Sequence, residues 1–155
     1  MWLRAAAVMS FVSIAVALAG GCSIQSSPTP ALGSTPACSL VPDMDQLVGR
    51  PQIGSPSGYT IEGKSQCIWT YRADPSRHVS LTVGAAQTHG SSIDAFGTGQ
   101  SIAGLGDDAR WWPQIHGLSV ARGNRAFQVN LALDEADASQ DLAVSIARSV
   151  LEHLP

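Results

Sequence analysis

Cys22 is the residue whose surroundings point most directly to chemistry. Arg4, an apolar run over residues 5–19 and small residues before Cys22 follow the layout of an export signal ending in a bacterial lipobox. In such a signal the cysteine thiol receives a diacylglyceryl group, and palmitate or a similar acyl chain completes the anchor. The usual leucine position holds Ala19, so a secreted protein with a chance cysteine is the alternative. We expect residues 1–21 to be a lipoprotein signal peptide and Cys22 to be lipidated.

Membrane attachment then depends on this lipid. As a helix the apolar run would span about 22 Å, which is short of the ~30 Å hydrocarbon core of a bilayer. Residues 22–37 are rich in serine, proline and threonine and have no apolar periodicity, so they cannot bury a core. We expect residues 22–37 to be the lipidated cysteine and a tether that holds residues 38–155, a single α+β domain, at the outer face of the cytoplasmic membrane.

The other two cysteines, Cys38 and Cys67, are left as a pair once Cys22 is lipidated. Outside the cytoplasm such a pair is expected to be a disulfide. Closing a loop of about 30 residues stabilises a fold by roughly 3.5 kcal/mol. A zinc site is the alternative, but the four histidines form no HxxxH cluster and no CxxC occurs. The sequence therefore predicts a Cys38–Cys67 disulfide and no metal or other cofactor.

The charge balance argues against partners that need a basic surface. The chain has 9 basic and 12 acidic residues, and the basic ones are scattered along it. Without a basic patch there is nothing to neutralise a row of phosphates. We therefore expect no nucleic-acid partner and no electrostatic attraction to anionic lipid.

Two glycine-containing segments match nucleotide-binding formulas but lack the flanking elements of such sites. "GYTIEGKS" at residues 58–65 fits GxxxxGK[ST], but a turn-rich segment precedes it and a strand follows, where a P-loop needs a strand and then a helix. "GLGDDA" at residues 104–109 fits GxGxxA, but the residues after it have the pattern of a strand. We expect no nucleotide site, and we expect Gly104 and Gly106 to supply positive φ at a turn.

Acidic and histidine side chains keep an enzymatic alternative open. Asp107 and Asp108, beside Arg110, could hold a cation or act as an acid–base pair. Adjacent carboxylates on a turn are more often solvated or cap backbone amides. No GxSxG elbow occurs, so an enzyme would need a histidine gathered with a serine and an aspartate in one cleft. The histidines concerned are His78, His89 and His116.

Adjacent tryptophans offer a possible binding surface. In a strand Trp111 and Trp112 point to opposite faces, so one core cannot hold both. One of them could line a groove for a small amphiphile or a partner protein. The alternative is that loops or helices cover both. Trp69, by contrast, shares a strand face with Cys67 and is expected in the core.

The elements that must position these residues suggest an α+β fold. A short helix is expected at residues 41–48, where Pro42 lies in the first turn and Gly49 follows the end. Apolar residues at helical spacing predict a long amphipathic helix over residues 136–153, and "SSIDAF" suggests a short helix between. Alternating apolar and polar residues predict strands at residues 66–72, 78–85, 109–112, 117–122 and 126–134.

The expected fold is a mostly antiparallel sheet of about five strands, with the short N-terminal helix and the long C-terminal helix packed on one face. Residues 52–65 are expected to be turns and loop. A hairpin is expected between residues 66 and 85, and Gly123 and Asn124 should form the turn between the last two strands.

Several short segments carry a family resemblance. They are "ACSLVPDMDQLVG", "CIWTY" with its partner "VSLTV", "IAGLGDDARWW", "GLSVARGNRAFQVNL" and the closing amphipathic helix. Together they resemble uncharacterised cell-envelope lipoproteins of actinobacteria, especially mycobacteria, that carry a domain of unknown function. The resemblance implies an exported, disulfide-closed α+β domain and assigns no catalytic residue.

These patterns favour a binding protein over an enzyme. We expect a lipid-anchored envelope protein with a non-enzymatic binding or accessory role toward an unknown envelope protein or a small amphiphile. The alternative is an envelope hydrolase or transferase whose site is built from separate residues. A structural role, or an inhibitor that presents residues 52–65 as a loop, is the remaining possibility.

Overall fold

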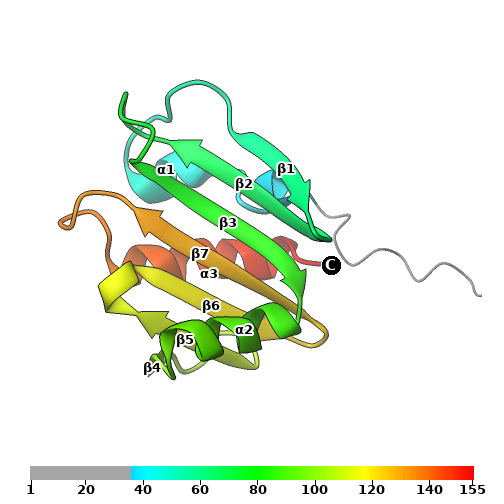
Figure 1. Ribbon diagram of the computed structural model, residues 1–155. Coiled ribbons are helices and arrows are strands. Elements are labelled where there is room, and N and C mark those ends of the chain that lie inside the picture. The colour runs from blue at the N-terminus through cyan, green and yellow to red at the C-terminus, as the bar shows by residue number, and fades with distance from the viewer. Residues whose placement is uncertain (1–35) are drawn as a thin grey trace, which may run out of the picture.

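The computed structural model describes residues 36–155, in which seven antiparallel strands form one sheet with the order β1-β2-β3-β7-β6-β5-β4 (Figure 1). The strands are β1 (Ser57–Ile61), β2 (Lys64–Thr70), β3 (His78–Ala85), β4 (Gln100–Ser101), β5 (Asp108–Trp112), β6 (Gly117–Arg122) and β7 (Arg125–Ala132). The helical elements are η1 (Ala37–Leu40), α1 (Met44–Val48), α2 (Gln87–Phe96), η2 (Pro113–Ile115) and α3 (Gln140–His153).

One face of the sheet, here called the apolar face, carries the core. Its central row runs across five strands, and each member is the register partner of the next: Cys67, Leu81, Val129, Leu118 and Trp111. All five side chains are buried. Since side chains alternate between faces along a strand, this one register places every second residue of five strands in the same core.

Helix α3 covers the apolar face behind the sheet (Figure 1). Ser139 caps its start by accepting a hydrogen bond from the Leu142 backbone N–H at 3.2 Å. Its small and branched side chains at helical spacing are fully buried, namely Ala143, Ile146, Ala147 and Val150. The predicted C-terminal amphipathic helix is therefore confirmed, and it begins at Gln140 rather than near residue 136.

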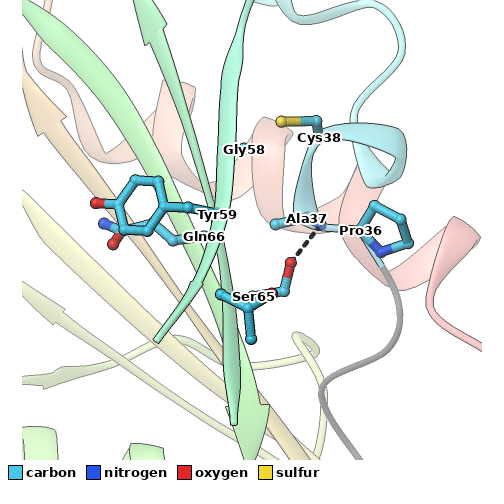
Figure 2. A pocket seen from close by; sticks show the side chains of 8 residues that line it. Pro36, Ala37, Cys38, Gly58, Tyr59, Ser65 and Gln66 are labelled. Carbon is cyan, nitrogen blue, oxygen red and sulfur yellow. Dashed lines mark hydrogen bonds between the residues drawn. The ribbon is translucent and has the colours of Figure 1, made fainter. Parts of the chain in front are cut away.

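The disulfide joins the N-terminal end of the domain to β2. Cys38 in η1 and Cys67 in β2 are bonded, with their Cα atoms 5.0 Å apart, as the sequence predicts. Close by, the Ala37 backbone N–H donates to Ser65 Oγ at 2.9 Å (Figure 2). Gly58 on β1 lies against this bridge, because a Cβ there would come within 3.1 Å of Cys38 Sγ. The first residues of the domain are thus fixed beside β1 and β2.

The polar face of the sheet differs from the expected arrangement, because it too carries a helix. Helix α2 packs there against β3, β6 and β7, in front of the sheet in Figure 1. The residues it buries are Thr88, His89 and Ser92, none of them apolar. "SSIDAF", expected as a short separate helix, is the C-terminal part of α2.

Seven strands replace the expected five, so that count was too low. The extra strands are β1 and β4. All five β1 residues are exposed, so no buried alternation marks it within a segment expected to be turns. A two-residue turn with positive φ at Glu62 (50°) and Gly63 (74°) folds it back on β2. Strand β4 has only two residues, too few to leave a periodic pattern.

The predicted N-terminal helix at residues 41–48 is shorter in the structure. A 3₁₀ turn at residues 37–40 precedes Pro42, and α1 begins only at Met44. Gly49 ends α1 with φ 76°, where its N–H bonds to the carbonyls of Asp45 and Gln46. Within residues 36–155 no helix combines the length and the apolar character needed to cross a bilayer.

The bridge predicts a measurable stability difference. Replacing Cys38 and Cys67 together by alanine should lower the free energy of unfolding by about 3 kcal/mol, since the unfolded chain regains the freedom of a loop with 29-residue separation. The matched control is urea unfolding of the wild-type domain with and without a reductant. Reduction should lower its free energy of unfolding by most of the same amount. Equal stability of all three samples would contradict a stabilising role for the bridge.

Candidate functional site

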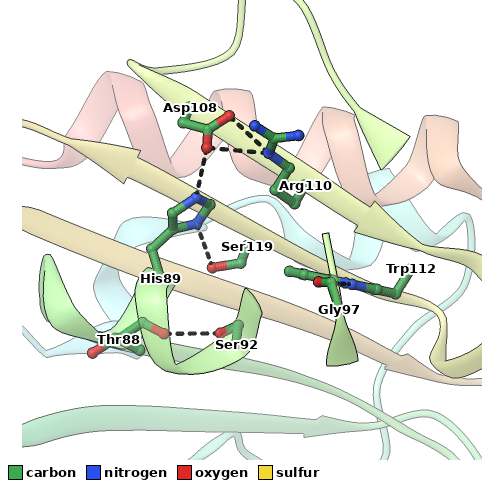
Figure 3. A network of polar contacts seen from close by, with 8 residues as sticks. All are labelled: Thr88, His89, Ser92, Gly97, Asp108, Arg110, Trp112 and Ser119. Carbon is green, nitrogen blue, oxygen red and sulfur yellow. Dashed lines mark hydrogen bonds and ion pairs between the residues drawn. The ribbon is translucent and has the colours of Figure 1, made fainter. Parts of the chain in front are cut away.

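The polar face brings together a serine, a histidine and an aspartate. His89 comes from α2, Asp108 from β5 and Ser119 from β6 (Figure 3). Ser119 is the register partner of Arg110, and Asp108 lies two residues before Arg110 on the same face of β5. The helix crosses the sheet closely at its start, where a Cβ on Gly84 would come within 2.6 Å of Thr88 Oγ1. This close crossing sets His89 over β5 and β6.

The imidazole of His89 bridges the other two groups. Its Nδ1 lies 3.0 Å from Ser119 Oγ, and its Nε2 lies 3.0 Å from Asp108 Oδ2. Arg110 Nε donates to the same carboxylate, 3.0 Å from Oδ1 and 3.1 Å from Oδ2. Beside this set, Gln128 donates to Ser92 Oγ, whose own hydrogen is donated to the Thr88 carbonyl at 2.8 Å. Polar contacts of this kind connect α2 to the sheet.

The Asp108 carboxylate is held in its ionised form. Partial burial acts against the charge, but hydrogen bonds from His89 and Arg110 and the positive charge of Arg110 outweigh it. The pKa of Asp108 therefore lies below its ordinary value. An ionised carboxylate on Nε2 favours the imidazole tautomer that carries its hydrogen there, so Nδ1 is left to accept a hydrogen bond from the Ser119 hydroxyl.

The three residue types are those of acyl-transfer enzymes, but the arrangement differs from a working triad. In such triads the carboxylate faces Nδ1 and the serine faces Nε2, which is the reverse of the contacts here. Ser119 has no exposed surface, and α2 lies over it. It stands in β6 between β5 and β7, so neighbouring strands use the backbone amides that an oxyanion would need. The geometry suits a contact that holds α2 on the sheet.

The two tryptophans lie on opposite faces of β5, and both are covered. Trp111 belongs to the apolar core with 4% of its surface exposed, and Trp112 on the polar face has 2% exposed. Trp112 Nε1 donates to the Gly97 carbonyl at 3.0 Å (Figure 3). The Trp112 ring centroid lies 6.0 Å from that of Phe96. The expected groove at Trp111 or Trp112 is absent from this surface, because the core and the end of α2 cover the rings.

The remaining motifs have structural roles in the described residues. "GYTIEGKS" is the β1–β2 hairpin, so it has neither the loop nor the helix of a P-loop. Gly104 and Gly106 have φ of 71° and 66°, as predicted for a turn. Asp107 caps the backbone, because its Oδ2 accepts from the Gly123 N–H at 2.6 Å. No group of three or more His, Cys, Asp or Glu side chains within residues 36–155 could hold a metal ion.

A shallow hollow of about 320 Å³ lies where the chain enters the domain. Pro36, Ala37 and Cys38 form one wall, and Gly58 of β1 lies on the other (Figure 2). Thr60 of β1 also lines the hollow. Ser65 also lines it, with its hydroxyl already bound to the Ala37 N–H. The hollow is open and offers no charged group, so it has the character of a surface groove beside a sheet edge.

Comparison with family models, with curated proteins and with solved structures finds no match to this chain.

His89, Asp108 and Ser119 are here called the His89 cluster. Part of this cluster could be found in the sequence. His89 and Asp108 stand out separately as candidate groups, but nothing in the sequence links them, because they lie 19 positions apart and β4 stands between their elements. Ser119 gives no signal beyond its place as a polar residue in a strand. The β5–β6 hairpin could have placed Ser119 near Asp108 and Arg110, whereas the position of α2 over them follows only from the fold.

The lowered pKa of Asp108 predicts that α2 loosens in acid. A carboxyl group whose pKa is depressed on folding contributes stability above its unfolded value, and that stability is lost as the pH falls through the folded value. Protection of α2 backbone amides from hydrogen exchange should therefore decrease as the pH falls from about 5 toward 2.5, with α3 amides as the internal reference. Asp108→Asn should lower α2 protection at the higher pH and remove this dependence. Wild-type α2 protection that follows α3 at every pH would contradict the prediction.

Proposed function

We propose that this chain is an exported, lipid-anchored protein of the cell envelope whose domain has a non-enzymatic binding or accessory role. The observation that carries the proposal is the Cys38–Cys67 disulfide. The chain has 3 cysteines, so this bridge leaves Cys22 as the one outside it. Persistent structural disulfides belong to oxidising compartments outside the cytoplasm. An export signal before Cys22 and a bridge after it therefore support the same location.

Lipid on Cys22 explains why a single cysteine would be kept there. In an oxidising compartment a free thiol at the start of a tether would form bonds between chains, whereas acylation removes the thiol. Two or more acyl chains give stable anchoring, because each buried methylene contributes about 0.8 kcal/mol. The resemblance to actinobacterial envelope lipoproteins points in the same direction.

A binding role is favoured because the side chains that could do chemistry are covered, whereas apolar side chains are exposed at the surface. The His89 cluster is packed between α2 and the sheet, with Ser119 fully buried. Of the large apolar side chains that are exposed in residues 36–155, Tyr59 and Ile61 share one face of β1, whereas Ile53, Phe96 and Ile115 lie in other segments. Exposed apolar groups grouped in one region are typical of surfaces that meet another molecule.

The anchor can be tested on the N-terminus itself. We expect the mature chain from an actinobacterial host to begin at Cys22, to carry the mass of a diacylglyceryl group, and to enter the detergent phase on partitioning. Cys22→Ala should lack the added mass and leave the detergent phase, while the tether variant Ser26→Ala should behave as wild type. A wild-type N-terminus without lipid would refute the anchor.

An envelope hydrolase or transferase is the second candidate, and the 3.0 Å contacts of His89 to Ser119 and Asp108 are the observation in its favour. Catalysis would require α2 to move off β6, because a substrate must reach Ser119 Oγ. The neutral polar contacts that hold α2 are each worth about 1 kcal/mol and the bond of His89 to the ionised Asp108 about 1.5–3 kcal/mol, so this motion costs several kcal/mol.

A serine-directed fluorophosphonate separates the two candidates. We expect the folded domain to remain unlabelled over hours, because the Ser119 hydroxyl is covered and bonded to His89. Ser119→Ala serves as the blank, and Ser39→Ala at an exposed serine serves as the matched control. Stoichiometric labelling that disappears in both Ser119→Ala and His89→Ala would favour the enzyme.

A further inference from the structure

We infer that β1 is a self-association edge, along which a second copy of this chain adds its own β1 antiparallel and continues the sheet. The pairing is centred on Tyr59, and the two-fold axis passes between the two Tyr59 residues. The inference rests on the proposed function in one respect, namely that lipid anchors confine both copies to one membrane. The strand pairing itself is argued from the domain.

Strand β1 forms a free end of the sheet. It is first in the strand order and, among residues 36–155, pairs only with β2, and all five of its residues are exposed. The two-residue turn makes Ile61 and Lys64 a hydrogen-bonded pair, so Tyr59 and Ser57 also direct their backbone groups toward β2. The N–H and C=O groups of Gly58 and Thr60 therefore face outward, and no bond to them from residues 36–155 occurs.

In the part of the chain that the structure describes, this edge lacks the features that usually prevent strands from pairing. Sheet edges are commonly protected by charged side chains, proline, a bulge or a covering loop. Strand β1 has the sequence SGYTI, without charge or proline, and its register with β2 is unbroken over five residues. The opposite edge shows the contrast, because β4 has only two residues and offers little to pair with.

The strand is complementary to itself. With Tyr59 opposite Tyr59 of the second copy, Gly58 lies opposite Thr60 of that copy, and the reverse holds by symmetry. Each Gly58–Thr60 pair exchanges two backbone hydrogen bonds, so all four outward groups on each copy are satisfied. No charged side chain within β1 opposes another across the axis.

Side chains on the Tyr59 face add apolar contact to this pairing. Tyr59 is 40% exposed and Ile61 is 56% exposed, and both lie on the same face of β1. Figure 2 shows Tyr59 and Gln66 on the side of the hairpin opposite Ala37 and Cys38. In the pair, the two Tyr59 rings are neighbours at the axis, and each Ile61 lies opposite Ser57 of the second copy. Cross-strand contacts of this kind contribute roughly 0.2–1 kcal/mol each.

The position at which the chain enters the domain favours a second copy of this chain over other partners. Pro36, where the tether reaches the domain, lines the same hollow as Gly58 and Thr60. A two-fold axis normal to the sheet keeps this hollow on the same face in both copies. Both tethers then leave from one side and can reach one membrane.

The size of the contact also fits anchored copies. A pair of five-residue strands buries less than the roughly 1,200 Å² of a stable soluble complex, so the contact is weak in dilute solution. Confinement of both copies to one membrane raises the effective concentration and favours the pair.

Cysteine cross-linking tests both the pairing and its register. Facing residues of a non-hydrogen-bonded antiparallel pair have Cα atoms about 4.5 Å apart, within the range of a disulfide. In membranes that hold the full chain, Tyr59→Cys should give a covalent dimer under mild oxidation, with the bond at residue 59 by mass spectrometry. Ser57→Cys alone should stay monomeric, whereas a mixture of Ser57→Cys and Ile61→Cys chains should cross-link.

A second pair of variants removes the edge without disturbing the hairpin. In the Tyr59→Cys background, Thr60→Pro deletes an N–H that points away from β2 and should reduce the dimer at least tenfold, while Thr60→Val should retain it. A monomeric Tyr59→Cys chain, equal cross-linking at Ser57→Cys, or a dimer unaffected by Thr60→Pro would each overturn the inference. The same cross-linking is carried out on the non-lipidated domain at about 1 mM, a concentration of the order that tethering provides. If the anchor fails but the pairing is correct, this domain still gives the predicted register pattern. If the pairing is wrong, neither sample gives it.

Discussion

Burial of one face of the sheet is the interaction on which the rest of the structure depends. Five strands contribute every second residue to it, and the row from Cys67 to Trp111 shows that their registers agree across the whole width. A slip of one residue in any of these strands would turn its apolar side chains to the other face. Helix α3 and η1 complete the same core, so the C-terminal and N-terminal ends of the domain are both held by it.

The polar face follows from this constraint. Once the apolar residues occupy one side, the alternate positions are left with Gln, Ser, Thr and Asp, and the element that covers them must satisfy hydrogen bonds rather than bury hydrocarbon. Helix α2 does so with Thr88, His89 and Ser92. The histidine between Ser119 and Asp108 therefore has a structural explanation, although its residue types belong to acyl-transfer chemistry. Because α2 is attached through the ionised Asp108, we expect its attachment to weaken in acid.

The disulfide and the sheet edge connect the domain to its proposed place on a membrane. The bridge from η1 to β2 fixes Pro36 beside β1, and Gly58 permits the close approach of Cys38. Pro36 thus lies beside the strand whose outer hydrogen-bonding groups find no partner within residues 36–155. An anchor and a self-pairing edge at the same end of the sheet would assemble copies side by side on one surface.

Local patterns in the sequence determined much of the core. Alternation predicted β2, β3, β5, β6 and β7, helical spacing predicted α3, and cysteine counting predicted the Cys38–Cys67 bridge, because each signal lies in a short segment or a residue count. Lipidation of Cys22 remains a prediction outside the described residues. Only the tertiary structure decided that residues 57–61 are a strand. Its five residues are all exposed, without an alternation of buried and exposed positions, and the strand exists because it pairs with β2. The tertiary structure also placed His89 over Asp108 and Ser119 and covered Trp111 and Trp112, because contacts between distant segments depend on how helices pack on the sheet.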